Sequence, residues 1–430
     1  MSDSITKKDL VSYGILAMPL AFAGIPLYIH APDFYATTYN VSLGALGLVL
    51  LVLRFIDAMQ DPIIGVLSDR HSINRPVIML AAALLLAVSF ALLFSPLTDL
   101  YIAWFGVFTF LSTTAFSILT VNLNTLGGLW SRDKNHKTTI ASYRETFGLV
   151  GLIIAVILPG LLQNNMGKEQ SFHIVSLTLF GLVFVGIAFF WKWQKKHQHV
   201  NTSHNKEKFS LKEFLDISRQ TKKFFCIYGI SIFASSVPAV LVLFFIRDRL
   251  NLENYTGLFL LLYFLSGASG IPIWRFLSYK LSKYKAWLGA MILAVISFVW
   301  AYFLSSGDFW QYLVICVLSG VAFGAELILP SSILADHIHE NRKESQASLH
   351  FGTLAFLAKL SLALAAVLSL PFLDIIGFVP ATENNVQVLH GLSLSYALIP
   401  CAIKLSSIYL LWGFEDEENF SNINNRNDHA

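Results

Sequence analysis

The sequence predicts an all-α membrane protein whose twelve transmembrane helices form two halves of six helices each. Its 430 residues are 55% hydrophobic and only 13% charged, whereas soluble domains carry about 25% charged residues. The mean hydropathy is +0.61. Apolar runs long enough to cross a bilayer recur along the chain, and a polar, basic stretch separates the sixth run from the seventh.

The runs before the basic stretch are each close to the length of about 20 residues that a membrane-spanning helix requires. They cover residues 11–33, 42–68, 76–96, 99–126, 139–162 and 171–193. No small-residue cleavage site follows the first run, so we expect it to be a retained span and not a signal peptide. Together these runs make up a predicted N-terminal half over residues 1–193.

The basic stretch itself is interpreted as a cytoplasmic linker over residues 194–222. The apolar runs that follow it cover residues 223–246, 255–279, 286–305, 309–334, 347–377 and 390–413. We assign them to a C-terminal half over residues 223–414. The acidic and Asn-rich residues 415–430 are predicted to form a disordered cytoplasmic tail.

Lysine and arginine residues mark alternate loops between the runs. Lys7 and Lys8 precede the first run, Arg132 follows the fourth and Arg342 follows the tenth. By the positive-inside rule, this distribution predicts a multi-pass protein of the cell inner membrane with both termini in the cytoplasm. The net charge of +3 belongs to this topology, so the expected partner is the lipid bilayer and not nucleic acid.

A cluster of charged residues interrupts the second run. Arg54, Asp57 and Asp61 are separated by three and then four residues, so they share one face of a helix. Each charge at a bilayer centre costs about 2.5 to 3.5 kcal/mol. Such a cluster is stable only where it faces the interior of a helix bundle or an aqueous cavity, and it therefore indicates an ion or solute site.

Two halves of six helices joined by a basic loop resemble the major facilitator superfamily, whose halves rock about a site at the bilayer midplane. The segment Gly65-Val-Leu-Ser-Asp69-Arg70, followed by Arg75, is similar to the superfamily's motif between its second and third helices. Glycine allows a close approach of helices. The resemblance implies that the charged residues make contacts that hold one conformation closed on the cytoplasmic side.

A narrower resemblance is carried by Arg54-Phe-Ile-Asp57-Ala-Met-Gln60-Asp61-Pro62-Ile-Ile-Gly65. This segment matches throughout the second-helix motif of the glycoside-pentoside-hexuronide:cation symporter family. Further matches follow in order along the chain: Ser12-Tyr13-Gly14, Tyr143-Arg144, Ala335-Asp336, Arg342-Lys343-Glu344-Ser345 and Lys359. The resemblance covers most of the chain.

The resemblance implies that Asp57 and Asp61 bind the coupling cation, with Gln60 and Ser117 as further ligands. Two carboxylates one helical turn apart repel each other, so the empty pair should bind Na⁺ or retain a proton. Na⁺ needs additional oxygen ligands, which an amide and a hydroxyl group can offer. The residues leave coupling to Na⁺ and coupling to H⁺ equally open. No other cofactor is expected.

The same resemblance places several residues at the solute cavity. Lys359 matches the family's lone lysine in the eleventh helix, which lies across the cavity from the acids of the second helix. Arg144 matches a family arginine near the cavity, although it could also be an ordinary topology charge. Arg54 is assigned to the cavity as well.

The departures from the family pattern bear on the solute. Galactoside carriers of the family use one aspartate in the first helix and another in the fourth, and these positions are Ala21 and Thr120 here. The aromatic residue that follows in the fourth helix is Asn124. A cavity without both carboxylates loses the charge-assisted hydrogen bonds that identify a galactosyl ring. Melibiose is therefore not an expected solute.

Glu326 lies within an apolar run and is the most notable remaining charge. It is either a ligand for solute or proton, or a structural partner for Lys404 or Lys359. Cys226, Cys316 and Cys401 stand singly in apolar runs without metal-ligand spacing, so no metal site is predicted.

The sequence therefore predicts a secondary active transporter that moves a small polar, sugar-like solute together with a cation by alternating access. A lysolipid or amphiphile carrier and a proton-coupled exporter remain alternatives, as does a nutrient sensor built on a transporter fold. No nucleophile motif, metalloprotease helix or phosphate loop occurs among the runs, so an enzyme is not expected. A monomer is expected to suffice because the cavity lies between its own two halves.

Overall fold

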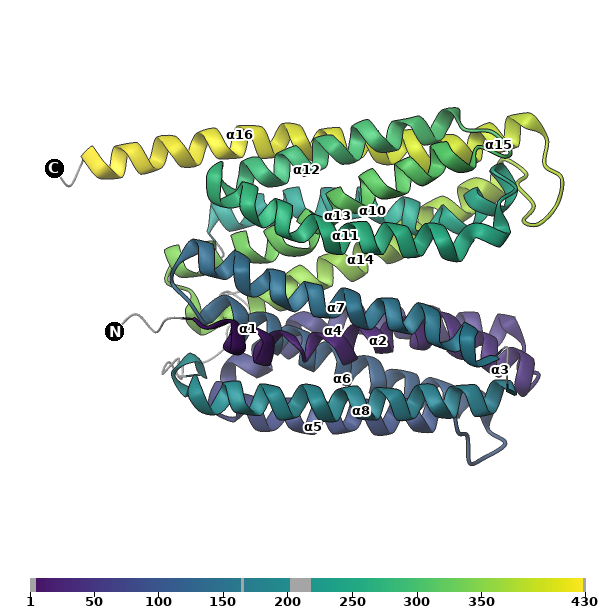
Figure 1. The fold of residues 1–430 in the computed structure, drawn as a ribbon, viewed down its shortest axis with the longest axis horizontal. Helices are drawn as coiled ribbons and strands as arrows, with labels where there is room; N and C mark the ends of the chain where they lie inside the picture. Colours follow the sequence, from purple (N-terminus) through teal and green to yellow (C-terminus); the bar gives the residue numbers. More distant parts are fainter. Residues whose placement is uncertain (1–4, 164–165, 202–217, 428–430) are drawn as a thin grey trace. The chain divides into compact units, whose positions relative to one another are not determined.

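A computed structural model describes residues 5–163, 166–201 and 218–427 (Figure 1). The regular secondary structure of these residues is entirely helical. Twelve of the helical segments are long and apolar enough to cross a membrane. They are Lys7–Thr38, Leu43–Arg70, Ser72–Leu93, Tyr101–Leu129, Lys134–Leu162, Lys168–Lys196, Arg219–Arg249, Glu253–Lys280, Lys283–Phe303, Phe309–Glu340, Glu344–Ile375 and Val386–Phe414. The predicted all-α fold with twelve spans is confirmed.

The first span is broken into shorter helices. It consists of α1 (Lys7–Gly14), α2 (Ala17–Ile25), a π-helical turn at Pro26–His30 and α3 (Ala31–Thr38). The helices that follow it are α4 (Leu43–Arg70), α5 (Arg75–Leu93), α6 (Tyr101–Leu129), α7 (Lys134–Gln163) and α8 (Lys168–Lys196).

The later spans contain one further interrupted helix. The helices are α10 (Arg219–Phe244), α11 (Thr256–Lys280), α12 (Lys283–Phe298), α13 (Phe309–Glu340), α14 (Ala347–Ile375), α15 (Val386–Ser393) and α16 (Ile399–Asn427). A π-helical turn at Leu394–Leu398 joins α15 to α16. The helical backbone of α16 continues to Asn427, which departs from the disorder predicted for residues 415–430.

The chain divides into two compact units whose boundary differs from the predicted halves. Unit 1 comprises Met1–Ser210 and Leu334–Lys359, and unit 2 comprises Leu211–Ile333 and Leu360–Ala430. The end of α13 and the beginning of α14 thus belong to unit 1, because their residues contact α4 and α7. Of the predicted linker 194–222, residues 202–217 lie outside the described residues.

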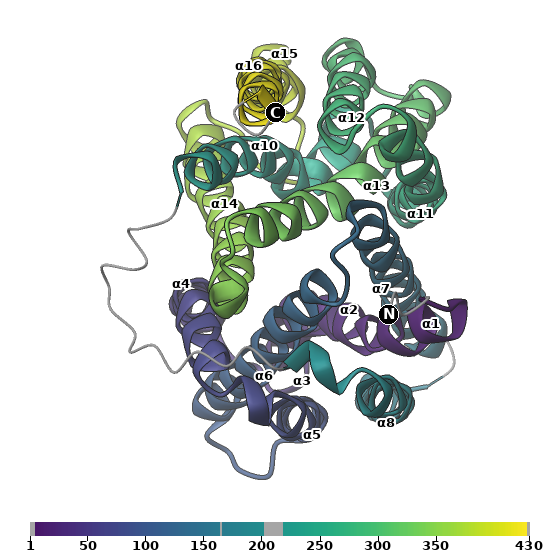
Figure 2. The ribbon, with the colours of Figure 1, turned by 90° about the vertical axis from the view of Figure 1, so that its left-hand side faces the viewer.

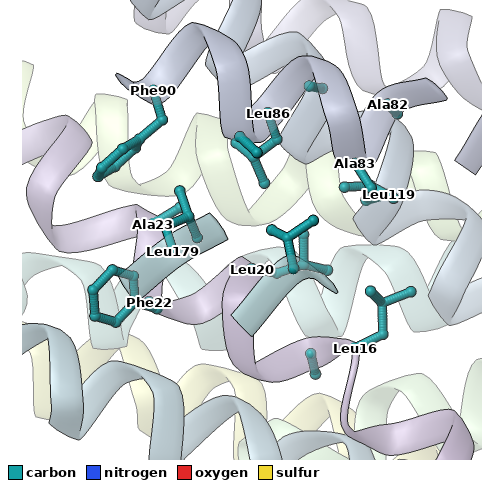
Figure 3. Packing of buried hydrophobic residues seen from close by; sticks show 14 of the residues in the cluster. Leu16, Leu20, Phe22, Ala23, Ala82, Ala83, Leu86, Phe90, Leu119 and Leu179 are labelled. Atoms are coloured by element: carbon teal, nitrogen blue, oxygen red, sulfur yellow. The ribbon is translucent and has the colours of Figure 1, made fainter. Parts of the chain in front are cut away.

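The core of unit 1 is formed by apolar faces of its long helices. Leu20 of α2, Leu86 of α5, Leu119 of α6 and Leu179 of α8 are buried in one cluster, which Figure 3 shows from close by. α5 packs against α6 and α8, and α2 packs against α7. Figure 2 shows α5 and α8 side by side. This packing fixes the position of the helices that carry the charged residues.

Unit 2 has a core of its own that includes a buried tyrosine pair. The hydroxyl oxygens of Tyr312 and Tyr396 lie 2.8 Å apart, and Tyr396 stacks on Phe245 with 4.0 Å between ring centroids. α16 packs against both α10 and α12. The hydrogen bond satisfies two hydroxyl groups that would be costly to bury alone.

Within unit 2, α11 and α13 approach closely at small residues. A Cβ atom on Gly324 would lie 2.5 Å from the carbonyl oxygen of Gly267, and one on Gly270 would lie 2.5 Å from that of Val321. Trp274 donates a 2.7 Å hydrogen bond from its indole N–H to the Val321 carbonyl. Small residues allow such backbone approach between membrane helices.

We expect Gly324→Ala to lower the free energy of unfolding by about 1–3 kcal/mol, because the added methyl group overpacks the contact with Gly267. Thermal unfolding of the purified protein in detergent measures the change. The matched control is Gly257→Ala at the start of α11, where a Cβ atom meets no atom within 4 Å. Equal stability of the two variants would contradict the close α11–α13 contact.

Candidate functional site

The site is built on α4, which positions two carboxylates inside the membrane span. α4 begins after Ser42, whose side chain accepts a hydrogen bond from the backbone N–H of Ala45. Asp57 and Asp61 lie one helical turn apart, and both are buried in unit 1. The predicted clustering of the two acids on one helix face is therefore present.

Lys359 of α14 places its ammonium group between the two carboxylates. Its Nζ atom donates hydrogen bonds of 2.9 Å to Oδ1 of Asp57 and 2.9 Å to Oδ1 of Asp61. It donates another of 2.7 Å to the hydroxyl of Ser117 on α6. These three oxygen atoms surround one monovalent cation, which in this structure is the ammonium group of the protein itself.

Polar side chains from neighbouring helices surround Asp57. Ser117 donates a 3.2 Å hydrogen bond to its Oδ1 atom, and Tyr28 donates one of 3.0 Å to Oδ2. The amide nitrogen of Gln60 also donates to Oδ1, at 2.8 Å, while the amide oxygen of Gln60 accepts from Thr114 at 3.0 Å. Gln60 was predicted to offer an oxygen to the cation, but here its nitrogen faces the site.

One oxygen atom of the site has a different environment. Oδ2 of Asp61 is buried and has no hydrogen-bond partner among the described residues. A buried carboxylate oxygen without a partner is costly. It can be stabilised by a bound proton or by a cation that uses it as a ligand.

Arg54 does not pair with the acids of its own helix. Its guanidinium carbon lies 4.8 Å from the ring centroid of Tyr28, which is the tyrosine that donates to Asp57. Arg54 therefore reaches the carboxylate pair through the tyrosine ring, in a cation–π contact.

The other residues predicted for the solute cavity are distributed over both units. Arg144 of α7 is buried in unit 1, where its Nε and Nη2 atoms donate to Glu145 at 2.8 and 2.6 Å. The hydroxyl of Thr120 is buried without a hydrogen-bond partner among the described residues, and Asn124 is half-buried. Glu326 belongs to unit 2, whereas Arg144, Thr120 and Asn124 belong to unit 1.

The predicted loop motif meets the beginning of α14 within unit 1. Asp69 accepts hydrogen bonds from the backbone N–H groups of Ser348 at 3.0 Å and Leu349 at 2.9 Å. It thus caps the N-terminus of α14, where a negative charge is favourable. Arg75 is buried, donates to the Ser348 hydroxyl at 2.9 Å and lies 3.4 Å from Asp69.

Glycine residues bring the same two helices together. A Cβ atom on Gly65 would overlap the carbonyl oxygen of Ser348, and one on Gly352 would lie 2.5 Å from the carbonyl oxygen of Asp61. The group of Asp57, Asp61 and Lys359 and the contacts of Asp69 therefore share one closely packed pair of helix segments. Arg70, the remaining predicted residue of the motif, is exposed at the end of α4.

Sequence reasoning missed two ion pairs between α7 and the end of α13. Lys137 lies 3.1 Å from Asp336 with both side chains buried, and Lys134 lies 2.5 Å from Glu340 with both exposed. The lysines were interpreted only as topology charges. Lys134 and Lys137 are three residues apart, and Asp336 and Glu340 are four residues apart at the end of another helix. This similar spacing was the available signal for a pairing.

Tyr28 was also missed as a partner of Asp57. It follows Pro26 in the π-helical turn of the first span, and no sequence pattern links it to the second span. Among the described residues, no group of three or more His, Cys, Asp or Glu side chains is arranged to hold a metal ion.

Comparison with known proteins identifies the class of protein. A family model described as MFS/sugar transport protein matches residues 10–415. The chain belongs to this family of the major facilitator superfamily and is a multi-pass membrane protein. This result confirms the resemblance that the second-helix motif carries.

Individual relatives agree with that assignment at low identity. The chain is 22% identical to an uncharacterized symporter of Bacillus subtilis, YnaJ, over 98% of this chain and 96% of the relative. It is 22% identical to a glucuronide carrier protein homolog of Escherichia coli, over 96% and 93% of the two chains. The fold is similar to that of a bacterial homologue of the iron transporter ferroportin, with a TM-score of 0.72, 13% identity, and coverage of 95% and 99%.

We expect Asp336→Asn to lower the free energy of unfolding by about 3–5 kcal/mol, because it leaves the buried Lys137 without its opposite charge. The matched control is Glu340→Gln, which removes the exposed pair nearby and should cost at most about 1 kcal/mol. Unfolding of both variants in detergent measures the difference. A loss at Asp336 no larger than that at Glu340 would show that the buried pair is not a stabilising contact.

Proposed function

We propose that this protein is a cation-coupled symporter that moves a small polar, sugar-like solute across the membrane by alternating access. The observation that carries the proposal is the ammonium group of Lys359 held between Asp57 and Asp61. Two carboxylates in a membrane span need a cation, and three side-chain oxygen atoms here surround a single monovalent ammonium group.

The charges at the site support coupling to one cation. Asp57 and Asp61 together carry two negative charges when ionised, and Lys359 supplies one positive charge. One further Na⁺ or H⁺ would neutralise the group, and the unpartnered Oδ2 of Asp61 is the atom best placed to receive it. The coupling ion stays open between these two, because either can neutralise a buried carboxylate.

We propose that Lys359 and the coupling cation compete for the same oxygen atoms. Na⁺ requires several oxygen ligands, and Asp57, Asp61 and Ser117 supply them only if the ammonium group moves away. Movement of Lys359 would shift the beginning of α14, which packs on α4 at Gly352. Cation binding would thereby change the hydrogen bonds between Asp69 and the N-terminus of α14.

These contacts support a conformational role for the loop motif. Asp69, Arg75 and the buried Lys137–Asp336 pair all connect early helices of the chain to Leu334–Lys359. We propose that they hold one transport conformation and break when the protein changes to the other. By the distribution of lysine and arginine, this end lies in the cytoplasm, with both termini, in a protein of the inner membrane.

The solute class is supported by the family and by a relative's name. The matching family is one of sugar transport proteins, and one relative is named a glucuronide carrier homolog.

A monomer is proposed to suffice, and neither enzymatic activity nor nucleic-acid binding is part of the proposal. An exporter would use the same cation site, so the direction of cation flux during solute uptake into proteoliposomes separates the two alternatives.

We expect cation linkage to depend on Asp61. A cation at a hundredfold excess over its Kd stabilises the folded protein by about 2.7 kcal/mol, and Asp61→Asn should remove this effect because it removes the charge the cation neutralises. Thermal unfolding with Na⁺ or with K⁺, between pH 5 and pH 8, measures it. The control is Asp99→Asn, in an exposed loop.

A Na⁺ response lost in Asp61→Asn would identify Na⁺ as the ligand. A pH response lost in that variant, without a Na⁺ response in the wild type, would identify H⁺. Responses that are unchanged in Asp61→Asn would contradict the site.

We expect Lys359→Met to increase the affinity for Na⁺ at least tenfold, if Na⁺ is the ligand, because the competing ammonium group is gone. If H⁺ is the ligand, the carboxylate pair of this variant should keep its bound proton up to a higher pH than the pair of the wild type. Titration of thermal stability with Na⁺ and with pH measures both, and Lys195→Met, at an exposed lysine, is the control. Weaker cation binding in Lys359→Met would show that the lysine supports the site and does not compete for it.

A further inference from the structure

Unit 2 contains a buried pair of opposite charges that is separate from the group of Asp57, Asp61 and Lys359. Lys404 of α16 forms a short ion pair with Oε1 of Glu326 on α13. Its Nζ atom also donates at 2.9 Å to the hydroxyls of Ser231 and Ser235 on α10 and at 3.1 Å to the carbonyl of Ser231. The same hydroxyls donate to Glu326, from Ser231 to Oε1 at 3.0 Å and from Ser235 to Oε2 at 3.1 Å.

The hydrogen bonds of this cluster distinguish the two charged residues. An ammonium group has three N–H donors, and four oxygen atoms surround that of Lys404, so it retains no donor for a ligand. A carboxylate can accept about four hydrogen bonds, and Glu326 accepts three within the described residues. The remaining position is on Oε2, which has only Ser235 as a partner.

The side chains of this cluster differ in how deeply they are buried. Ser231 is 1% exposed and the side chain of Lys404 is 6% exposed, whereas the side chain of Glu326 is 10% exposed and Ser235 is half-buried. Lys404 is the more deeply buried of the two charged side chains, and its ion pair with Oε1 fixes the orientation of the Glu326 carboxylate. Oε2, which is bonded to the half-buried Ser235, is the atom of the carboxylate that can still accept a hydrogen bond.

Aromatic rings adjoin this carboxylate. Phe323 precedes Glu326 by three residues on α13, so the two share a helix face. Phe323 stacks with Tyr263 of α11 at 5.3 Å between ring centroids, and both are half-buried. A single oriented acceptor next to apolar rings is the composition of a small-molecule site, and it matches a sugar ring, which has hydroxyl donors at its edge and an apolar C–H face.

We propose that Glu326 accepts hydrogen bonds from hydroxyl groups of the transported solute and that Lys404 positions it for this task. The solute class is a neutral sugar or glycoside, because an ionised carboxylate repels a uronate or sulfonate. This inference rests on the proposed transport function. It assigns to unit 2 the charged acceptor that Ala21 and Thr120 do not supply in unit 1.

The test is solute-dependent thermal stabilisation of the full-length protein in detergent. The probes are methyl α-D-glucopyranoside, methyl β-D-galactopyranoside and methyl β-D-xylopyranoside, with D-glucuronate as the anionic comparison. We expect at least one neutral probe to stabilise the wild type, and Glu326→Gln to weaken that response at least tenfold, because the charge-assisted hydrogen bond is lost. A response to D-glucuronate alone, or to none of the probes, would overturn the proposal.

A second variant separates solute binding from a structural role. Glu326→Gln leaves the ammonium group of Lys404 buried without its counter-ion, so the double variant Glu326→Gln/Lys404→Gln restores a neutral cluster with donors and acceptors. We expect the double variant to recover thermal stability but to keep the weakened response to the neutral probe. Recovery of a wild-type response would show that the pair is only structural.

Two controls complete the test. Ser236→Ala removes a neighbouring hydroxyl that donates to the carbonyl of Ile232 on its own helix, and it should leave the probe response unchanged. The cation response described for Asp61 should persist in Glu326→Gln. Absence of that cation response in the wild type would contradict the proposed coupling. Loss of the probe response in Glu326→Gln, with the cation response unchanged, would bear only on the proposed role of Glu326.

Discussion

The structure depends on the ammonium group of Lys359 held between Asp57 and Asp61. Unpaired, these charges would each destabilise a membrane span by several kcal/mol. Together with Ser117 they form a compact hydrogen-bonded group in which one positive charge is shared by two negative ones. With both carboxylates ionised the group would carry one net negative charge, and the proposed uptake of a further cation rests on this imbalance.

The same interaction lies on a pair of helices, α4 and α14, whose contacts extend to the end of α4. Lys359 lies on α14, and Asp69 of α4 accepts hydrogen bonds at the N-terminus of the same helix. Between Lys359 and this N-terminus, close contacts at glycine residues hold α4 and α14 together. Packed helices transmit a shift because their close contacts are not compressible. We therefore expect a change in charge at Asp61 to alter the contacts at the N-terminus of α14 through the helix packing itself.

Lys359 and Lys404 pair with different numbers of carboxylates. Lys359 is shared by two carboxylates, and on this excess of acidic groups rests the proposal that the group binds a cation. Lys404 has one carboxylate, Glu326, and serine hydroxyls that use all of its donors. That group is neutral, and its remaining capacity is to accept a hydrogen bond. We therefore propose the first arrangement for the cation and the second for a neutral solute.

The sequence by itself determined the helical class, the twelve spans and the placement of Asp57 and Asp61 on one face, because hydrophobic length and helical periodicity are local properties. The lone lysine Lys359 was assigned by resemblance. Only the tertiary structure decided that Tyr28 bonds to Asp57, that Gln60 turns its nitrogen to the site, and that Lys137 meets Asp336. These contacts join residues far apart in the chain, so their partners depend on how the helices pack and not on any local pattern.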